Sequence, residues 1–175
     1  MSIDSARAAA LAMALCVLLA AGSAPCAASA EESTPSAAKI SPVELVKSSS
    51  KGTLKNPYTD AMPAIVARGE GLFQSTACSA CHGAKGGGGL CPPVTNDVWV
   101  YGGDDDTLFR LITLGSDQLQ HQGYTRTGHE SIVASMPAFG GAVASADDVW
   151  AIITFIRAQF AGDPQQKFGA APAHP

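Results

Sequence analysis

Three stretches of the chain place apolar residues three and four positions apart, which is the spacing of one buried helix face. They lie within residues 61–73, 107–114 and 146–161. Gly115 is placed to end the second helix, and Ser145 opens the third as part of a capping box. No segment keeps the alternating pattern of a strand. The sequence therefore predicts a small all-α fold of about three main helices and long loops.

The first helix leads towards a group of cysteines. Thr59 or Asp60 is placed to cap it, and its apolar positions extend from Met62 to Phe73. We expect this helix to run directly into the cysteine motif that follows it. Residues 83–89 contain five glycines and no apolar rhythm, so they predict a loop.

Residues 1–30 have the features of a cleaved signal peptide. Arg7 precedes an apolar run over residues 8–21, and residues 28–30 form a small-residue cleavage site. The run is shorter than the roughly 18 residues that a membrane span needs. A transmembrane anchor and a lipoprotein attached at Cys26 are the alternatives. The sequence predicts export to the periplasm with no stable membrane insertion.

The rest of the chain divides into three parts. Residues 31–55 are rich in Ser, Ala, Lys and Pro and are expected to form a flexible leader, although a short apolar cluster there could dock as a helix. Asn56–Pro57 marks the entry to a domain over residues 56–162, because a residue before proline is disfavoured in helix. Residues 163–175 are expected to be a disordered tail. A domain of this size buries a modest core, which a large apolar cofactor would enlarge.

Composition and charge narrow the possible partners. The chain has 46% apolar residues and a net charge of −4. Residues 56–163 hold eleven acidic and five basic side chains, whereas four lysines lie just upstream. An acidic domain disfavours nucleic acid and anionic membranes and favours a partner with a basic docking face.

Three cysteines remain after signal cleavage, so they cannot all pair with one another. Two of them belong to Cys78-Ser79-Ala80-Cys81-His82, which matches the C-x-x-C-H pattern of covalent haem attachment. On one helical turn Cys78 and Cys81 share a face and can meet two haem vinyl groups, with His82 directed at the iron. A thioredoxin-like disulfide would need a βαβ pattern, and a zinc site would need a second ligand pair. Neither is present in the sequence.

The chain resembles class I cytochromes c in four features that follow in order. They are Gly69 with Phe73, Pro92, the run Met136-Pro137-Ala138-Phe139, and the apolar residues Ile152, Phe155 and Ile156. The resemblance implies a helix crossing at Gly69, a Pro92 carbonyl that accepts a hydrogen bond from His82, and Met136 as the sixth iron ligand. It also implies one covalently bound haem c and an electron-transfer role without enzymatic activity. A ligand sensor with an open axial site is an alternative.

The residues around Met136 also favour its role as a ligand. It lies 54 positions after His82, which is enough chain to reach the other haem face. Pro137 restricts the backbone beside it. His121 and His129 are the competing ligands, but both lie in a polar segment.

Several residues have more than one interpretation. Trp99 and Tyr101 could donate hydrogen bonds to a haem propionate or simply pack. Residues 104–106 are three consecutive aspartates, which are expected to be a solvated turn that caps the next helix rather than a calcium site. Cys91 stands where the family usually has glycine. We interpret it as a buried thiol, with an intermolecular disulfide or a redox-sensitive thiol as the alternative.

The glycine loop, Cys91-Pro92-Pro93 and residues 98–106 resemble the periplasmic cytochromes associated with bacterial methanol oxidation. That resemblance implies a quinoprotein alcohol dehydrogenase as electron donor and a cytochrome oxidase further along the respiratory chain. We expect a monomer. A haem subunit of a membrane-associated dehydrogenase or oxidase complex is the alternative.

Overall fold

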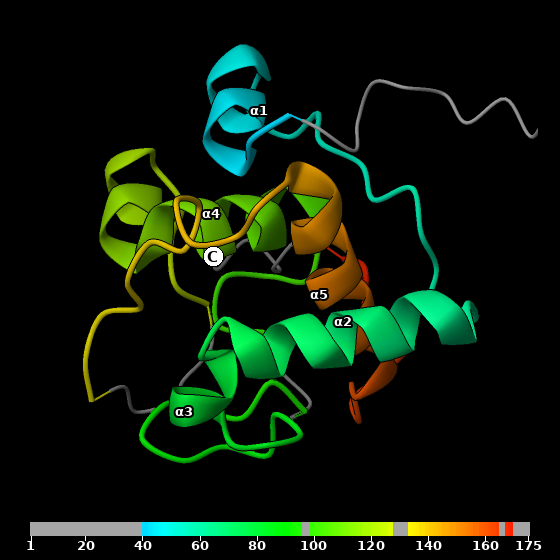
Figure 1. The fold of residues 1–175 in the computed structure, drawn as a ribbon. Coiled ribbons are helices and arrows are strands. Elements are labelled where there is room, and N and C mark those ends of the chain that lie inside the picture. Colours follow the sequence, from blue (N-terminus) through cyan, green and yellow to red (C-terminus); the bar gives the residue numbers. More distant parts are fainter. Residues whose placement is uncertain (1–39, 96–98, 128–132, 165–166, 170–175) are drawn as a thin grey trace, which may run out of the picture. The chain divides into compact units, whose positions relative to one another are not determined.

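A computed structural model describes residues 40–95, 99–127, 133–164 and 167–169, all of which belong to one unit of the chain. These residues form an all-α fold without strands (Figure 1). Its helices are α1 (Pro42–Ser48), α2 (Pro63–Ser75), α3 (Cys78–His82), α4 (Asp105–His121) and α5 (Ala146–Ala158). None of the described helices combines the length and the apolar character needed to cross a membrane. The predicted signal peptide lies outside the described residues.

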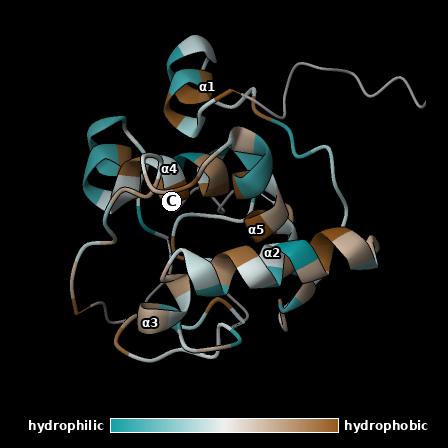
Figure 2. Cartoon of the chain, in the orientation of Figure 1, coloured by the Kyte–Doolittle hydropathy of each residue, from teal (hydrophilic) through white to brown (hydrophobic). Residues whose placement is uncertain are grey.

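Helices α2 and α5 cross closely, and this contact is the largest between any two helices. A Cβ atom at Gly69 would lie only 2.0 Å from the Ala151 carbonyl oxygen, so the crossing requires glycine. One turn further along, the rings of Phe73 and Phe155 pack with centroids 5.3 Å apart. Figure 2 shows hydrophobic residues on α5 where it passes behind α2. The crossing expected at Gly69 is therefore present.

The ends of α2 differ from the prediction. The helix begins at Pro63 with Met62 as its N-cap, so neither Thr59 nor Asp60 caps it. Proline is favoured at the first helical position because its φ angle is already helical. At the other end α2 does not continue into the cysteine motif, because Ala77 adopts a left-handed φ of 63°. The motif forms its own short turn, α3.

Helix α4 extends beyond its predicted end. Gly115 has non-helical angles (φ 77°, ψ 167°), but the chain resumes a helical course and continues to His121. Gly115 is therefore a break within α4 and not its end. Ser145, by contrast, caps α5 as expected, because its hydroxyl accepts a hydrogen bond from the Asp148 amide at 3.2 Å.

The segment expected to be a flexible leader is folded over residues 40–55. Helix α1 contacts both α4 and α5, and Val46 and Leu54 are each 6% exposed. The Ile40 carbonyl accepts a hydrogen bond from the Ala146 amide at 2.9 Å. The short apolar cluster of this segment thus joins the core, because the small domain gains buried apolar area from it.

The described part of the expected tail also contacts the domain. Lys167 forms an ion pair with Asp60, and the Gly103 amide donates to the Gly169 carbonyl at 3.0 Å. Residues 165–166 and 170–175 lie outside the described part of the chain.

Replacing Gly69 with alanine should destabilise the fold by about 2 to 3 kcal/mol, because the new methyl group overlaps the α5 backbone. Gly71→Ala is the matched control on the same helix, since a Cβ there meets nothing within 4 Å. Guanidinium unfolding of both variants measures the difference. Equal unfolding midpoints would contradict the close crossing.

Candidate functional site

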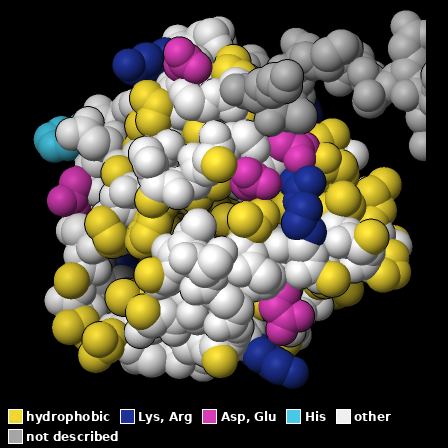
Figure 3. Space-filling model, viewed as in Figure 1, with side chains coloured by type: hydrophobic (Ala, Val, Ile, Leu, Met, Phe, Trp, Pro, Cys, Tyr) yellow, Lys and Arg dark blue, Asp and Glu magenta, His cyan; other side chains and the backbone are white. Residues whose placement is uncertain are grey.

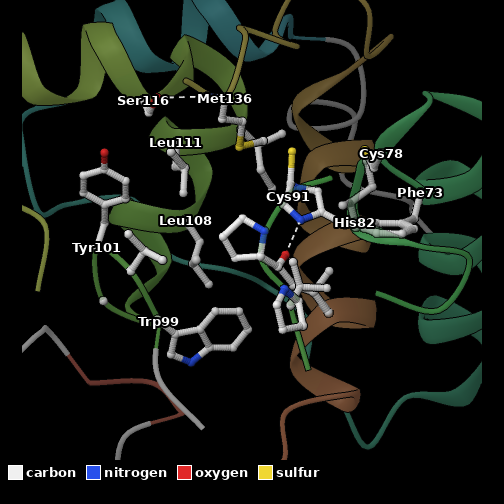
Figure 4. A pocket seen from close by; sticks show the side chains of 18 of the residues that line it. Phe73, Cys78, His82, Cys91, Trp99, Tyr101, Leu108, Leu111, Ser116 and Met136 are labelled. Atoms are coloured by element: carbon white, nitrogen blue, oxygen red, sulfur yellow. Dashed lines mark hydrogen bonds between the residues drawn. The ribbon is translucent and has the colours of Figure 1, made fainter. Parts of the chain in front are cut away.

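An apolar pocket lies between α3, α4, α5 and the loop that carries Met136. It has about 990 Å³ of empty space including its open mouth. Its apolar wall includes Phe73, Leu108, Leu111, Ile112, Ile152 and Ile156. Figure 4 shows His82 entering from the α3 side and Met136 from the loop beside α4, with both side chains directed into this space.

The turn α3 carries both cysteines of the motif. Cys78 is buried, lines the pocket and has Thr76 Oγ1 at 3.3 Å from its sulfur. Burial raises the pKa of the Cys78 thiol, so the group is protonated and not ionised at neutral pH. Cys81 lies on the same turn and is half-buried. Both thiols are free in the structure.

The imidazole of His82 is held by a backbone carbonyl of the loop that follows it. Its Nδ1 atom lies 2.7 Å from the Pro92 carbonyl oxygen (Figure 4). A carbonyl can only accept, so Nδ1 carries the proton and Nε2 keeps a free lone pair. The loop that presents Pro92 is tied back to α3, because the Gly88 and Cys91 amides donate to the His82 and Cys81 carbonyls at 2.8 and 3.1 Å.

The break in α4 holds the loop of Met136. At Gly115 the helical hydrogen-bond pattern opens, and the freed groups bind the loop instead. The Ser116 amide donates to the Met136 carbonyl at 2.9 Å, and the Met136 amide donates to the Ser116 hydroxyl at 3.0 Å. Beyond Met136, the Phe139 and Gly140 amides donate to the Ile112 and Thr113 carbonyls at 2.9 and 3.0 Å. Four hydrogen bonds therefore fix the backbone around Met136.

The two aromatic residues proposed from sequence both line the pocket. Tyr101 is 7% exposed, and its hydroxyl accepts a hydrogen bond from Gln120 at 2.8 Å. Trp99 is stacked on Phe160 with centroids 5.1 Å apart, and its buried indole N–H has no hydrogen-bond partner among the described residues. A buried donor without an acceptor is costly, which suggests that a bound group supplies one.

The three consecutive aspartates serve three separate structural roles. Asp104 caps α4 by accepting from the Thr107 amide at 3.0 Å, Asp105 pairs with Arg157 at 2.5 Å, and Asp106 is buried beside Arg110 at 2.9 Å. The expected helix cap is present, but Asp106 is not solvated. No group of three metal-binding side chains occurs among the described residues, including this segment.

Of the remaining candidate residues, Cys91 lines the pocket and His121 does not. Cys91 lines it half-buried, and burial together with the neighbouring Cys81 thiol raises the pKa of Cys91. His121 is exposed at the end of α4, and His129 lies outside the described residues. Sequence reasoning missed Arg126, which is the only Lys or Arg among the described lining residues. No local pattern indicated it, because it lies in an irregular polar stretch.

The chain matches one family of known proteins. Residues 64–156, more than half of the chain, match the family model described as cytochrome c oxidase, cbb3-type, subunit III. The chain belongs to this family. Its match is a cytochrome c domain, so the protein is an electron carrier with covalently attached haem c. No curated protein matches the chain.

The residues of this cytochrome c domain fit the cofactor. The lining of the pocket is mainly apolar and includes an imidazole nitrogen, a thioether sulfur and the Cys78 thiol, whereas Cys81 lies on the same turn as Cys78 but does not line the pocket. Imidazole, methionine and paired cysteines are the groups that hold haem c in proteins.

Replacing Gly115 with alanine should destabilise the cytochrome domain by about 2 to 4 kcal/mol, since residue 115 has a left-handed φ and a Cβ there would lie 2.6 Å from the Met136 carbonyl oxygen. Amide exchange at Met136 and Phe139 should also become faster than in the wild type. Gly141→Ala is the control, because a Cβ at residue 141 meets nothing within 4 Å. Unchanged exchange at both amides would contradict the clamp.

Proposed function

We propose that the protein is a periplasmic single-electron carrier that accepts electrons from a quinoprotein alcohol dehydrogenase and passes them towards a terminal oxidase. The observation that supports the carrier role is the entry of His82 and Met136 into one apolar pocket from different walls. In this proposal Cys78 and Cys81 form the two thioether bonds, and His82 and Met136 are the axial ligands.

When bound, haem c supplies an iron centre that changes reversibly by one electron. His82 and Met136 together would fill both axial positions, so no position would be open for a substrate or a gas. A thioether sulfur in an apolar surrounding favours the reduced state and raises the reduction potential. Pro92 fixes the imidazole by accepting its Nδ1 proton in a hydrogen bond.

The polar edge of the cofactor has several candidate partners. Trp99 can donate its unpartnered indole N–H, and Tyr101 can donate its hydroxyl hydrogen while it accepts from Gln120. Arg126 lines the same pocket and carries a positive charge. These three side chains would compensate the carboxylates of a haem propionate pair.

The periplasmic location and the donor rest on the sequence. The signal-peptide pattern of residues 1–30 supports export, and in an oxidising compartment the formation of thioethers would consume two thiols that oxidation would otherwise join. The resemblance of residues 98–106 to cytochromes of methanol oxidation supports a quinoprotein donor. On the face seen in Figure 3, acidic and basic side chains are interspersed, so this face offers no continuous charged area for docking.

A second candidate function follows from the family description, which names a subunit of an oxidase. The protein would then be a haem subunit of a membrane-associated complex. Gel filtration of the mature protein and of a detergent extract from its source separates the two. Elution of the extracted protein with a large complex would favour the subunit, and elution as a monomer would favour the carrier.

Met136→Ala should abolish the weak near-infrared band of sulfur–ferric coordination and lower the reduction potential, because the sulfur ligand is lost. Met62→Ala is the control, since Met62 is 41% exposed and does not line the pocket. Absorption spectra and potentiometry of both variants provide the measurement. A wild-type spectrum in the Met136 variant would exclude Met136 as the ligand.

A reduced quinoprotein methanol dehydrogenase should reduce the oxidised protein rapidly in a stopped-flow experiment. If the acidic domain docks on a basic face, the rate should fall as salt is added, because ions screen the attraction. A bacterial dehydrogenase that uses nicotinamide serves as the negative control. Slow reduction by the quinoprotein at all salt concentrations would exclude this donor while leaving the carrier role intact.

A further inference from the structure

We propose that residues 40–55 form a brace, called here the N-terminal brace, that holds both halves of α4 and thereby fixes Met136 as a ligand. The proposal deepens the function above and rests on the proposed ligand role of Met136. Neither the motif nor the family match, which begins at residue 64, includes the brace. Figure 1 shows α1 lying against α4.

The first contact of the brace is with the loop of Met136 itself. A Cβ at Gly140 would lie 2.9 Å from a Val43 methyl group, so α1 packs directly on the loop four residues after Met136. The same position is 2.7 Å from a Thr113 methyl group of α4. Gly140 is therefore enclosed between the brace and α4, which limits outward movement of the loop.

The second contact is a buried ion pair in the first half of α4. Arg110 and Asp106 are 4% and 2% exposed and pair at 2.9 Å. The Arg110 guanidinium also donates to the Ser49 and Ser50 carbonyls at 2.9 and 3.0 Å, and the Leu54 amide donates to Asp106 at 3.3 Å. The brace thus satisfies both members of a buried pair that would otherwise be costly.

The third contact is beyond the break at Gly115. The Lys51 ammonium group donates to the Gln122 and Gly123 carbonyls at 3.2 and 3.1 Å, where α4 ends. It also lies 4.0 Å from the centroid of the Tyr124 ring, at cation–π distance. The Tyr124 hydroxyl in turn donates to Asp106 in the first half of α4.

These contacts join the two halves of α4 on the side away from the pocket. The helix itself is interrupted at Gly115, and the loop of Met136 is bonded to both sides of the interruption. A change in the angle between the halves would therefore move Met136. Since the brace binds both halves, weakening it should increase the population in which the sulfur has left the iron.

Two mild substitutions test the proposal in the haem-loaded full-length protein. Lys51→Ala removes the contact beyond the break, and Val43→Ala removes the contact with Gly140. Lys47→Ala is the charge-matched control, because the exposed Lys47 makes no side-chain hydrogen bond or ion pair within the described part. Ile153→Val is the stability control, since Ile153 is fully buried but does not line the pocket.

The readout is competition by added imidazole, which binds ferric haem only when Met136 has left. Lys51→Ala and Val43→Ala should each bind imidazole roughly three- to tenfold more tightly than the wild type, because the open form is more populated. In both variants the near-infrared band should weaken, but less than in Met136→Ala, because most of the protein keeps the sulfur on the iron. Lys47→Ala and Ile153→Val should bind imidazole as the wild type does.

The proposal is overturned if Lys51→Ala and Val43→Ala bind imidazole no more tightly than Ile153→Val does, at similar unfolding midpoints. That result would leave Met136 as the proposed ligand. A near-infrared band absent from the wild type, or retained in Met136→Ala, would instead remove Met136 as the ligand, and the brace with it. The two failures therefore give different spectra.

Discussion

The left-handed turn at Gly115 is the constraint on which the pocket depends. A continuous α4 would use the Ile112 and Thr113 carbonyls and the Ser116 amide within the helix. With the helix interrupted, the same groups bind the backbone of the loop that carries Met136. The break removes helical hydrogen bonds, but the freed backbone groups of α4 form hydrogen bonds with the loop instead, so few of them are left unpaired. These hydrogen bonds fix the position of the Met136 loop, and therefore of the Met136 sulfur, relative to α4.

The side of the pocket that carries His82 is fixed by separate contacts, and α5 contributes residues to both the helix crossing and the pocket. Phe73 of α2 packs on Phe155 of α5, whereas Ile152 and Ile156 of the same helix line the pocket. His82 is set by the Pro92 carbonyl and by the loop bonded to α3. With haem bound, such double support would limit the movement of the His82 and Met136 side chains. A carrier benefits from this rigidity, because less reorganisation is needed at each electron transfer.

Local patterns in the sequence predicted the features whose partners are close in the chain. The cysteine motif, the Ser145 cap and the apolar faces of α2 and α5 are of this kind, and the family resemblance supplied the pairing of His82 with Pro92. At Gly115 the sequence predicts the end of a helix and not a break, because the loop residues that compensate the break begin at Met136, twenty-one residues later. Similarly, the three consecutive aspartates predict a solvated turn, whereas Asp106 is buried and its partners are Arg110, Tyr124 and the Leu54 amide. Burial of residues 40–55 depends on surfaces of α4 and α5 that only the folded domain presents.

The ion pairs within the domain and the exposed apolar side chains near the pocket affect how the domain can bind a partner. Arg68, Arg110 and Arg157 are each paired with an aspartate, which removes equal numbers of positive and negative charges and leaves the excess of acidic side chains in the domain unchanged. Leu90 and Val133, next to the pocket-lining Cys91 and Ala134, are 69% and 82% exposed. A redox partner at this edge would therefore meet isolated apolar side chains on a domain that carries an excess of acidic groups. Contacts of that kind suit a small, short-lived interface, which is what repeated exchange between a donor and an acceptor requires.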